Sequence, residues 1–180
     1  MATANRNKPA EGTNENIDSP LGKLFVHQLK DVYFAEKAIT KALPKMVKAA
    51  KSPELKEGFQ KHLKQTEEHV TRLEQVFDII GLRAEGTECE AIKGIIKEGD
   101  EVAQEFGNTA AGDSGLAASA QAVEHYEITR YGTLKAWARE LELDDAVELF
   151  EATEQEEIDT DETLTELAET LNENAMQSAV

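Results

Sequence analysis

The sequence predicts an all-α protein built as a four-helix bundle. Four long segments repeat apolar side chains at spacings of three and four residues, which is the period of one helix face. Two of the three connections between these segments are short, so each flanking pair should form an antiparallel hairpin. No stretch shows the two-residue alternation of a β-strand. The 180 residues are enough for one domain with a substantial core.

The first helix follows a polar N-terminal segment. Residues 1–18 lack an apolar period and are rich in Asn, Thr, Glu and Lys, so we predict a disordered tail. Ser19 followed by Pro20 is a typical helix start, with serine as the N-cap and proline at the first helical position. The helix is predicted over 20–50, and Pro44 inside it predicts a kink or a break.

The second helix and the connection after it define the topology. Ser52 should cap a helix over 53–80, and Gly81 should end it. Residues 81–113 are too many for a tight turn and contain a short amphipathic piece around Ala91–Phe106. Because a helix of about 28 residues is roughly 40 Å long, this connection can run the length of the bundle. One long crossover between two helical hairpins is the topology of ferritin-like folds.

Two further helices complete the predicted ferritin-like bundle. They are expected over 114–141 and 144–172, with Asp144 as the N-cap of the last one. The bundle therefore spans 19–172, and 173–180 form a C-terminal tail.

Charge and composition limit the classes of partner. The chain has 36 acidic and 19 basic residues, a net charge of −17, which repels nucleic acid and anionic lipid and attracts cations. We therefore expect no nucleic-acid partner and no membrane partner. We also expect a cytoplasmic location, because neither a signal peptide nor a run of roughly 20 apolar residues is present. The single cysteine, Cys89, cannot form an internal disulfide.

Polar residues interrupt the apolar stripes of all four helices near their middles. Glu36 and Thr66 lie almost equally far from the first short turn, and Glu127 and Glu157 lie almost equally far from the second. These residues should therefore share one level of the bundle. A second level, one helical turn further from the short turns, contains His69, Glu124 and Asp161.

Metal ions are the best explanation for this polar layer. Buried carboxylates that are ionised and unpaired are very costly, so protons, a buried cation or metal must neutralise them. Carboxylates and imidazole around an inner cavity bind two iron or two manganese ions in bundles of this topology. We predict iron or manganese, two ions at most, on six candidate ligands: Glu36, His69, Glu124, Glu127, Glu157 and Asp161. The alternative is a polar seam bridged by water, with some of these side chains turned outward.

The ligand spacing departs from the usual pattern. Two helices of such sites carry Glu-x-x-His, whereas here Thr66 precedes His69 and Thr160 follows Glu157 at that spacing. Either the other carboxylates supply the missing oxygens, or the site is weaker, holds one metal or is not redox-active. We interpret His62, nearer the turn, as a hydrogen-bonded core histidine.

Sequence motifs spread over residues 20–170 add a comparison with known proteins. The motifs are Asp31–Lys37, Thr40–Met46, Phe59–Leu63, Arg72–Val76, Val123–Ile128 and Tyr131–Leu134, followed by Glu156, Glu157, Thr160, Asp161 and Leu164. They resemble the YciE/YciF family of ferritin-like bacterial stress proteins. The resemblance implies a ferritin-like bundle, commonly a homodimer, that is linked to stress responses and has no settled enzymatic activity.

The same resemblance implies a di-metal site on Glu36, Glu124, Glu127 and Glu157. A glutamate often occupies the place of Gln65 in the family pattern, and this chain lacks it. Two functions remain open at this stage. One is a non-haem di-iron or di-manganese protein acting on peroxide or dioxygen, as an oxidase or a catalase-like enzyme. The other is a non-enzymatic stress protein with a degenerate site, acting through dimerisation or partner binding.

Overall fold

The structure, a computed structural model, describes residues 15–178. A short 3-10 helix, η1 (Glu15–Asp18), precedes five α-helices. The α-helices are α1 (Pro20–Ala49), α2 (Pro53–Ile79), α3 (Glu90–Phe106), α4 (Gly112–Glu140) and α5 (Asp144–Gln177). Residues 15–178 contain no β-strand, which confirms the all-α prediction. None of the helices in this range is long and apolar enough to cross a membrane.

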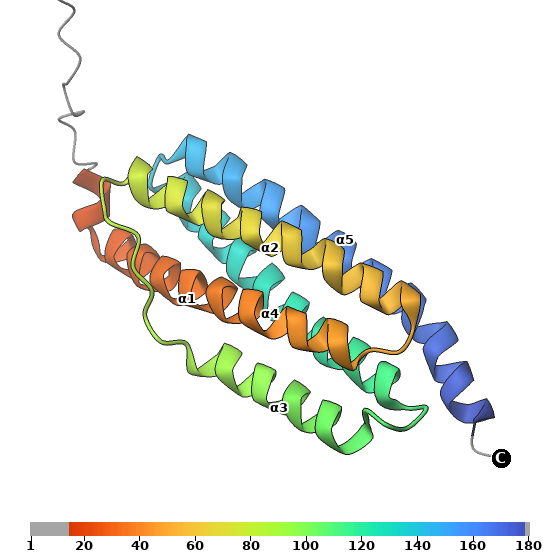
Figure 1. Ribbon diagram of the computed structural model, residues 1–180. Coiled ribbons are helices and arrows are strands. Elements are labelled where there is room, and N and C mark those ends of the chain that lie inside the picture. Colours follow the sequence, from red (N-terminus) through yellow and green to blue (C-terminus); the bar gives the residue numbers. More distant parts are fainter. Residues whose placement is uncertain (1–14, 179–180) are drawn as a thin grey trace, which may run out of the picture.

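Four of the helices lie side by side around a common core (Figure 1). α1 packs against α2 and α4 packs against α5, while α1·α4 and α2·α5 contacts join the two hairpins. The chain passes between the hairpins through residues 80–111, which include α3. α3 packs on the outside of α1 and α4.

The helix ends follow the predicted capping residues. The Ser19 hydroxyl accepts a hydrogen bond from the Gly22 amide at 3.0 Å, and the Ser52 hydroxyl accepts one from the Leu55 amide at 3.2 Å. Gly81, which follows the C-cap residue Ile80 of α2, has a φ of 71°, a conformation in which glycine carries little strain. Both predicted starts and the predicted stop are therefore confirmed.

Two predictions about α1 and its approach need correction. Of the predicted kink or break at Pro44, the break does not occur, since α1 continues through this residue. One missing backbone bond near the C-terminal end of the helix is outweighed by the burial of neighbours such as Leu43. The predicted tail also extends too far, since residues 15–18 form η1. Ile17 packs against the hydrophobic core there, and the Asn16 side chain donates a hydrogen bond to the backbone of Leu141. Residues 1–14 of that tail lie outside the described range.

The last helix also differs at both ends from its prediction. Leu143, rather than Asp144, precedes its first residue, and no side chain caps it. α5 continues to Gln177, past the predicted end at 172, and extends beyond the other helices in Figure 1. Leu171, just before these extra residues, is the last buried side chain of α5. Residues 179–180 of the predicted C-terminal tail lie outside the described range.

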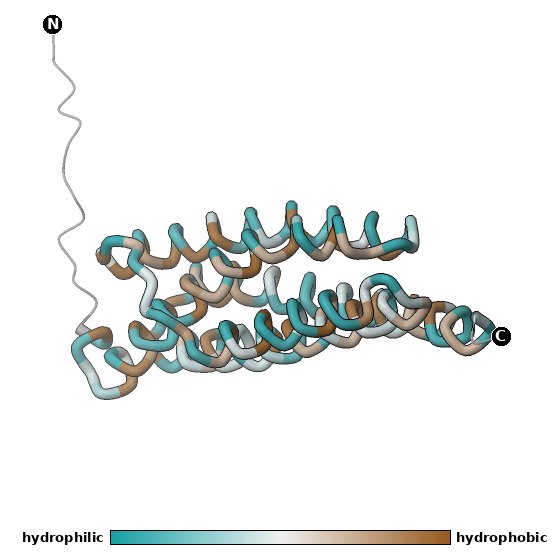
Figure 2. The backbone as a smooth tube through the Cα atoms, turned by 60° about the horizontal axis from the view of Figure 1, so that its bottom comes forward, coloured by the Kyte–Doolittle hydropathy of each residue, from teal (hydrophilic) through white to brown (hydrophobic). Residues whose placement is uncertain are grey.

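The core consists of two hydrophobic clusters. The aromatic cluster contains Phe25, Tyr33, Phe77, Tyr131 and Phe150, and Phe25 and Phe150 pack edge to face with ring centroids 6.0 Å apart. The aliphatic cluster, at the other end, includes Ile39, Leu43, Leu55, Leu116 and Leu164. Hydrophobic and hydrophilic segments alternate along the helices (Figure 2). Along all four long helices a buried polar layer separates the two clusters.

Candidate metal centre

The polar layer consists of buried acidic and imidazole side chains. Four carboxylates have 1% or less of their surface exposed: Glu36 from α1, Glu124 and Glu127 from α4, and Glu157 from α5. Two imidazoles from α2, those of His62 and His69, are buried beside them. Each position falls on the inner stripe of its helix, so helical periodicity alone brings side chains from all four helices together.

These side chains form two groups that could each hold a metal ion. The His62 group contains His62, Glu124, Glu127 and Glu157, and the His69 group contains Glu36, His69 and Glu157. Within each group, one ligand atom from every residue lies within 4.8 Å of the others. Because Glu157 belongs to both groups, the arrangement suits two ions that share one carboxylate.

His69 is held on both sides of its ring. Nδ1 faces the layer, 3.1 Å from Oε1 of Glu157 and 3.4 Å from Oε1 of Glu36. Nε2 lies 2.8 Å from Oε2 of Glu156. The Arg72 guanidinium donates two hydrogen bonds to the same carboxylate, of 2.7 and 3.0 Å. A carboxylate behind a histidine fixes which ring nitrogen faces the metal. Glu156 therefore orients Nδ1 of His69 as the ligand atom.

His62 has no such support. Its Nε2 lies 3.3 Å from Oε1 of Glu124, and its Nδ1 lies 3.8 Å from Oε2 of Glu157. Neither ring nitrogen has a hydrogen-bond partner among the residues that the structure describes.

Burial and mutual repulsion shift the titration of the layer. Burial, with the charges of nearby carboxylates, raises the pKa of Glu124 and of Glu127 well above the ordinary value. Burial alone would lower the pKa of His69, but the adjacent Glu36 and Glu157 raise it to about 11. Burial lowers the pKa of His62. Without metal, these shifts favour protons on His69 and on the carboxylates of α4.

The unpaired atoms of the layer fit a metal ion. Within residues 15–178, several buried atoms have no hydrogen-bond partner: Oε2 of Glu36, both nitrogens of His62, Nδ1 of His69, Oε2 of Glu124, and both oxygens of Glu127 and Glu157. Buried polar atoms without partners are rare and costly. Carboxylate oxygen and imidazole nitrogen are ligand types that iron and manganese accept. The donor set and its unsatisfied atoms therefore fit a two-ion site.

Comparison with known proteins gives the family. Residues 20–177 match the family described as Domain of unknown function (DUF892). The chain belongs to this family. It is 39% identical to Protein YciF of Escherichia coli strain K12 over 146 residues, which cover 81% of this chain and 88% of that protein. The predicted resemblance to the YciE/YciF family is thereby confirmed.

Solved structures agree with this assignment. The crystal structure of the E. coli stress protein YciF matches with a TM-score of 0.82 and 36% identity, covering 86% of this chain and 98% of that one. YcfI from Rhodopseudomonas palustris matches with a TM-score of 0.79 and 42% identity, covering 88% and 98%. A protein from Xanthomonas campestris, 21% identical with a TM-score of 0.67, shares the fold.

The structure brings five of the six predicted ligands together and leaves out Asp161. The five are Glu36, His69, Glu124, Glu127 and Glu157. Asp161 instead lies 3.2 Å from both the Gln121 amide nitrogen and Nε2 of His125, at the partly exposed edge of the α4–α5 contact. The buried stripe of α5 runs from Glu157 to Leu164 and passes between positions 160 and 161. A spacing of four from Glu157 therefore turns Asp161 out of the layer.

The two threonines at the half-motif positions contribute no ligand atom in this arrangement. The Thr66 hydroxyl donates to the backbone oxygen of His62, and the Thr160 hydroxyl donates to that of Glu156. Gln65 is different, because its Oε1 is buried and unpaired and it lines a small cavity beside His62 and Glu124.

Sequence reasoning missed two residues of the site, His62 and Glu156. His62 was interpreted as a core histidine, although it lies on the same stripe as His69. Glu156 was not identified as a partner of His69. Arg72, one helical turn from His69 and of opposite charge to Glu156, could have indicated that a carboxylate lies there. Tyr131, whose hydroxyl donates to Oε1 of Glu36, had its own signal in lying one turn from Glu127.

Proposed function

We propose that this protein is a ferritin-like stress protein whose four-helix bundle, with its long crossover, holds a di-metal site for iron or manganese that reacts with peroxide or dioxygen. The observation that carries the proposal is the pair of ligand groups joined by Glu157, in which buried donor atoms lack protein partners. Its relative YciF is a stress protein of E. coli, which supports the physiological part.

Each ion would have its own histidine. His62, Glu124 and Glu127 would hold one ion, Glu36 and His69 the other, and Glu157 both. Two ferrous ions bound there would supply two electrons, which with two protons reduce one hydrogen peroxide to two waters or one dioxygen to hydrogen peroxide.

The protein's own residues orient two ligands of the same ion. Glu156 contacts Nε2 of the buried His69, which keeps the ring proton on that nitrogen and leaves Nδ1 for the ion. The Tyr131 hydroxyl donates a hydrogen bond to Oε1 of Glu36, whose Oε2 has no partner within residues 15–178 and can bind the ion.

A cytoplasmic homodimer is part of the same proposal, and the family resemblance implies the homodimer. Large apolar side chains stand exposed on the surface of a single copy, among them Leu24, Ile79, Leu82 and Phe106. Exposed apolar surface favours self-association. Light scattering coupled to size-exclusion chromatography should give twice the mass of one chain, and a monomer would contradict this part.

Metal analysis with matched variants tests the central claim. Anaerobic reconstitution with ferrous or manganous ions should load the wild-type protein and raise its melting temperature, because a ligand of the folded state alone stabilises that state. Glu127→Gln should lose metal, whereas Asp161→Asn, outside both groups, should retain it. A wild-type protein that binds neither metal, and whose melting temperature chelator leaves unchanged, would instead support the non-enzymatic alternative.

A further inference from the structure

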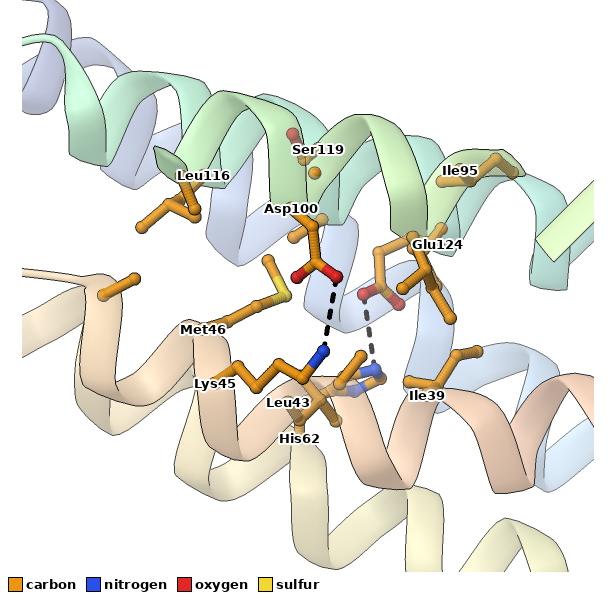
Figure 3. Close-up of a pocket in the computed structure, with 17 residues that line it drawn as sticks. Ile39, Leu43, Lys45, Met46, His62, Ile95, Asp100, Leu116, Ser119 and Glu124 are labelled. Carbon is orange, nitrogen blue, oxygen red and sulfur yellow. Dashed lines mark hydrogen bonds and ion pairs between the residues drawn. The ribbon is translucent and has the colours of Figure 1, made fainter. Parts of the chain in front are cut away.

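A small cavity lies between α1, α3 and α4 and ends at the His62 group. Its volume is about 50 Å³, and His62 and Glu124 are among the residues that line it. Figure 3 shows the interacting pair of His62 and Glu124 among the aliphatic side chains of Ile39, Leu43 and Ile95. The cavity thus joins the candidate metal centre to the side of the bundle that α3 covers.

Small side chains on three helices leave this space open. The small residues that line it are Ala42, Ala49, Gly99, Ala103, Ser119 and Ala120. Protein interiors are normally packed to crystal density, and a void forfeits the contacts of its walls. Small residues from three helices keep this void open beside a cluster of unpaired ligand atoms. We therefore asked which molecule could occupy it.

The walls of the cavity are apolar apart from its two ends. Aliphatic side chains and alanines make up most of the lining between the inner and outer ends. At the inner end are His62 and Glu124, and at the outer rim Lys45 and Asp100 form an ion pair of 3.3 Å (Figure 3). A polar solute would lose hydrogen bonds on entering such walls, whereas an apolar one would lose none.

We propose that dioxygen reaches the His62 group through this apolar cavity. The inference rests on the proposed function and names one co-reactant for it. The volume fits a diatomic gas, since an apolar cavity that holds benzene measures about 150 Å³. A separate cavity of about 30 Å³ between α2 and α5 also meets His62. Its wall combines apolar side chains such as Phe59 and Leu164 with the polar side chains of Lys61, Gln65 and Thr160. Hydrogen peroxide, which needs hydrogen-bond partners, therefore has an approach that does not pass through the first cavity.

Xenon tests the cavity without any metal. Xenon is an apolar atom that enters dry protein cavities, so crystals of the metal-free protein under xenon pressure should show it beside His62. Ala42→Leu should fill the space and exclude xenon. Ala38→Leu, one turn earlier on α1 and outside this cavity, should leave xenon in place. Ala103→Leu fills the same space from α3 and replaces the first variant if that one does not fold.

Reaction kinetics test the delivery of dioxygen. In ferrous-loaded protein of equal metal content, Ala42→Leu should slow oxidation by dioxygen several-fold and leave oxidation by hydrogen peroxide unchanged. Ala38→Leu should change neither rate. An empty wild-type cavity under xenon, or equal dioxygen rates in both leucine variants, would overturn the inference. Xenon binding in a protein that takes up no metal would overturn the proposed function instead and leave a gas-binding cavity without a reaction.

Discussion

His62 and His69 lie two helical turns apart on one face of α2, and both enter the same carboxylate layer, yet their surroundings differ. His69 is fixed from behind by Glu156, which Arg72 holds in turn, and its pKa is raised to about 11. His62 has no hydrogen bond on either nitrogen, and burial lowers its pKa. The stripe on α2 therefore buries both rings, while residues at the edge of the layer decide which ring is oriented in advance.

The comparison teaches that the two halves of the candidate centre are prepared to different degrees. The His69 group has its nitrogen ligand aimed before any ion arrives, so binding there costs little ordering. The His62 group has more carboxylates and adjoins the apolar cavity, but its imidazole must choose its orientation when the ion binds. We expect the His69 group to need less reorganisation but to release a proton when its ion binds, because its ring is protonated without metal.

The largest expected effect is the loss of both ions from Glu157→Gln, because Glu157 alone belongs to both groups. Glu36→Gln should remove only the ion of the His69 group, and Glu124→Gln only the ion of the His62 group. Metal analysis after anaerobic reconstitution would give the three stoichiometries. One ion retained in Glu157→Gln would show that the groups do not share this carboxylate.

Protonation should separate the two histidines next. In metal-free protein at pH 7 the His69 ring should be charged and the His62 ring neutral, as nitrogen NMR of the imidazoles would show. Because the folded pKa of His69 lies above its unfolded value near 6.5, its contribution to stability is complete below pH 6.5 and declines until about pH 11. For His62 the sign is opposite, so its burial costs stability as the pH falls below 6.5. If the His62 and His69 rings carried the same charge at pH 7, the claim that their surroundings shift their pKa values in opposite directions would be wrong.

Glu156→Gln should then weaken the ion of the His69 group by about 10–100-fold, the usual cost of losing a carboxylate behind a histidine ligand. Affinity for the ion of the His62 group should not change. The matched control is Glu154→Gln, two residues earlier on α5, where the carboxylate pairs with Lys135 instead. Calorimetric titration with manganous ions measures both sites, and equal losses in the two variants would contradict the role of Glu156.

The smallest effect should come from Arg72→Gln. Arg72 acts on His69 only through Glu156, and the ion pair between them is partly open to solvent. Partly exposed pairs of this kind contribute about 1 kcal/mol or less. The same titration should therefore show a few-fold loss for the His69 group, smaller than that of Glu156→Gln. A loss as large as that of Glu156→Gln would mean that the carboxylate does not hold His69 without its cation.

The sequence was enough to predict the helices and most of the buried layer, because both depend on local spacing. Serine–proline starts and the glycine stop set the helix ends, and distances from two short turns placed Glu36, Glu127 and Glu157 at one level. The direction in which each side chain faces the neighbouring helices could not be predicted from distances along the sequence. Asp161 lies outside both groups because the buried stripe of α5 passes beside it.

The other errors have the same origin. A stripe position shows that His62 is buried, but which carboxylates face it depends on how α2, α4 and α5 pack. Glu156 is only partly buried, beside the buried stripe of α5. It acts on the site because α2 brings His69 and Arg72 into contact with it.

The division of the chain into two hairpins has a consequence for the order of folding. The first hairpin carries Glu36, His62 and His69, the second carries Glu124, Glu127 and Glu157, and each ligand group takes members from both. Neither hairpin can therefore encircle an ion before it meets the other. Contacts within each hairpin are closer in sequence than contacts between the hairpins, which residues 80–111 separate. We therefore expect each hairpin to form before the two dock. An ion bound between the two hairpins would stabilise their docked arrangement, because its ligands come from both.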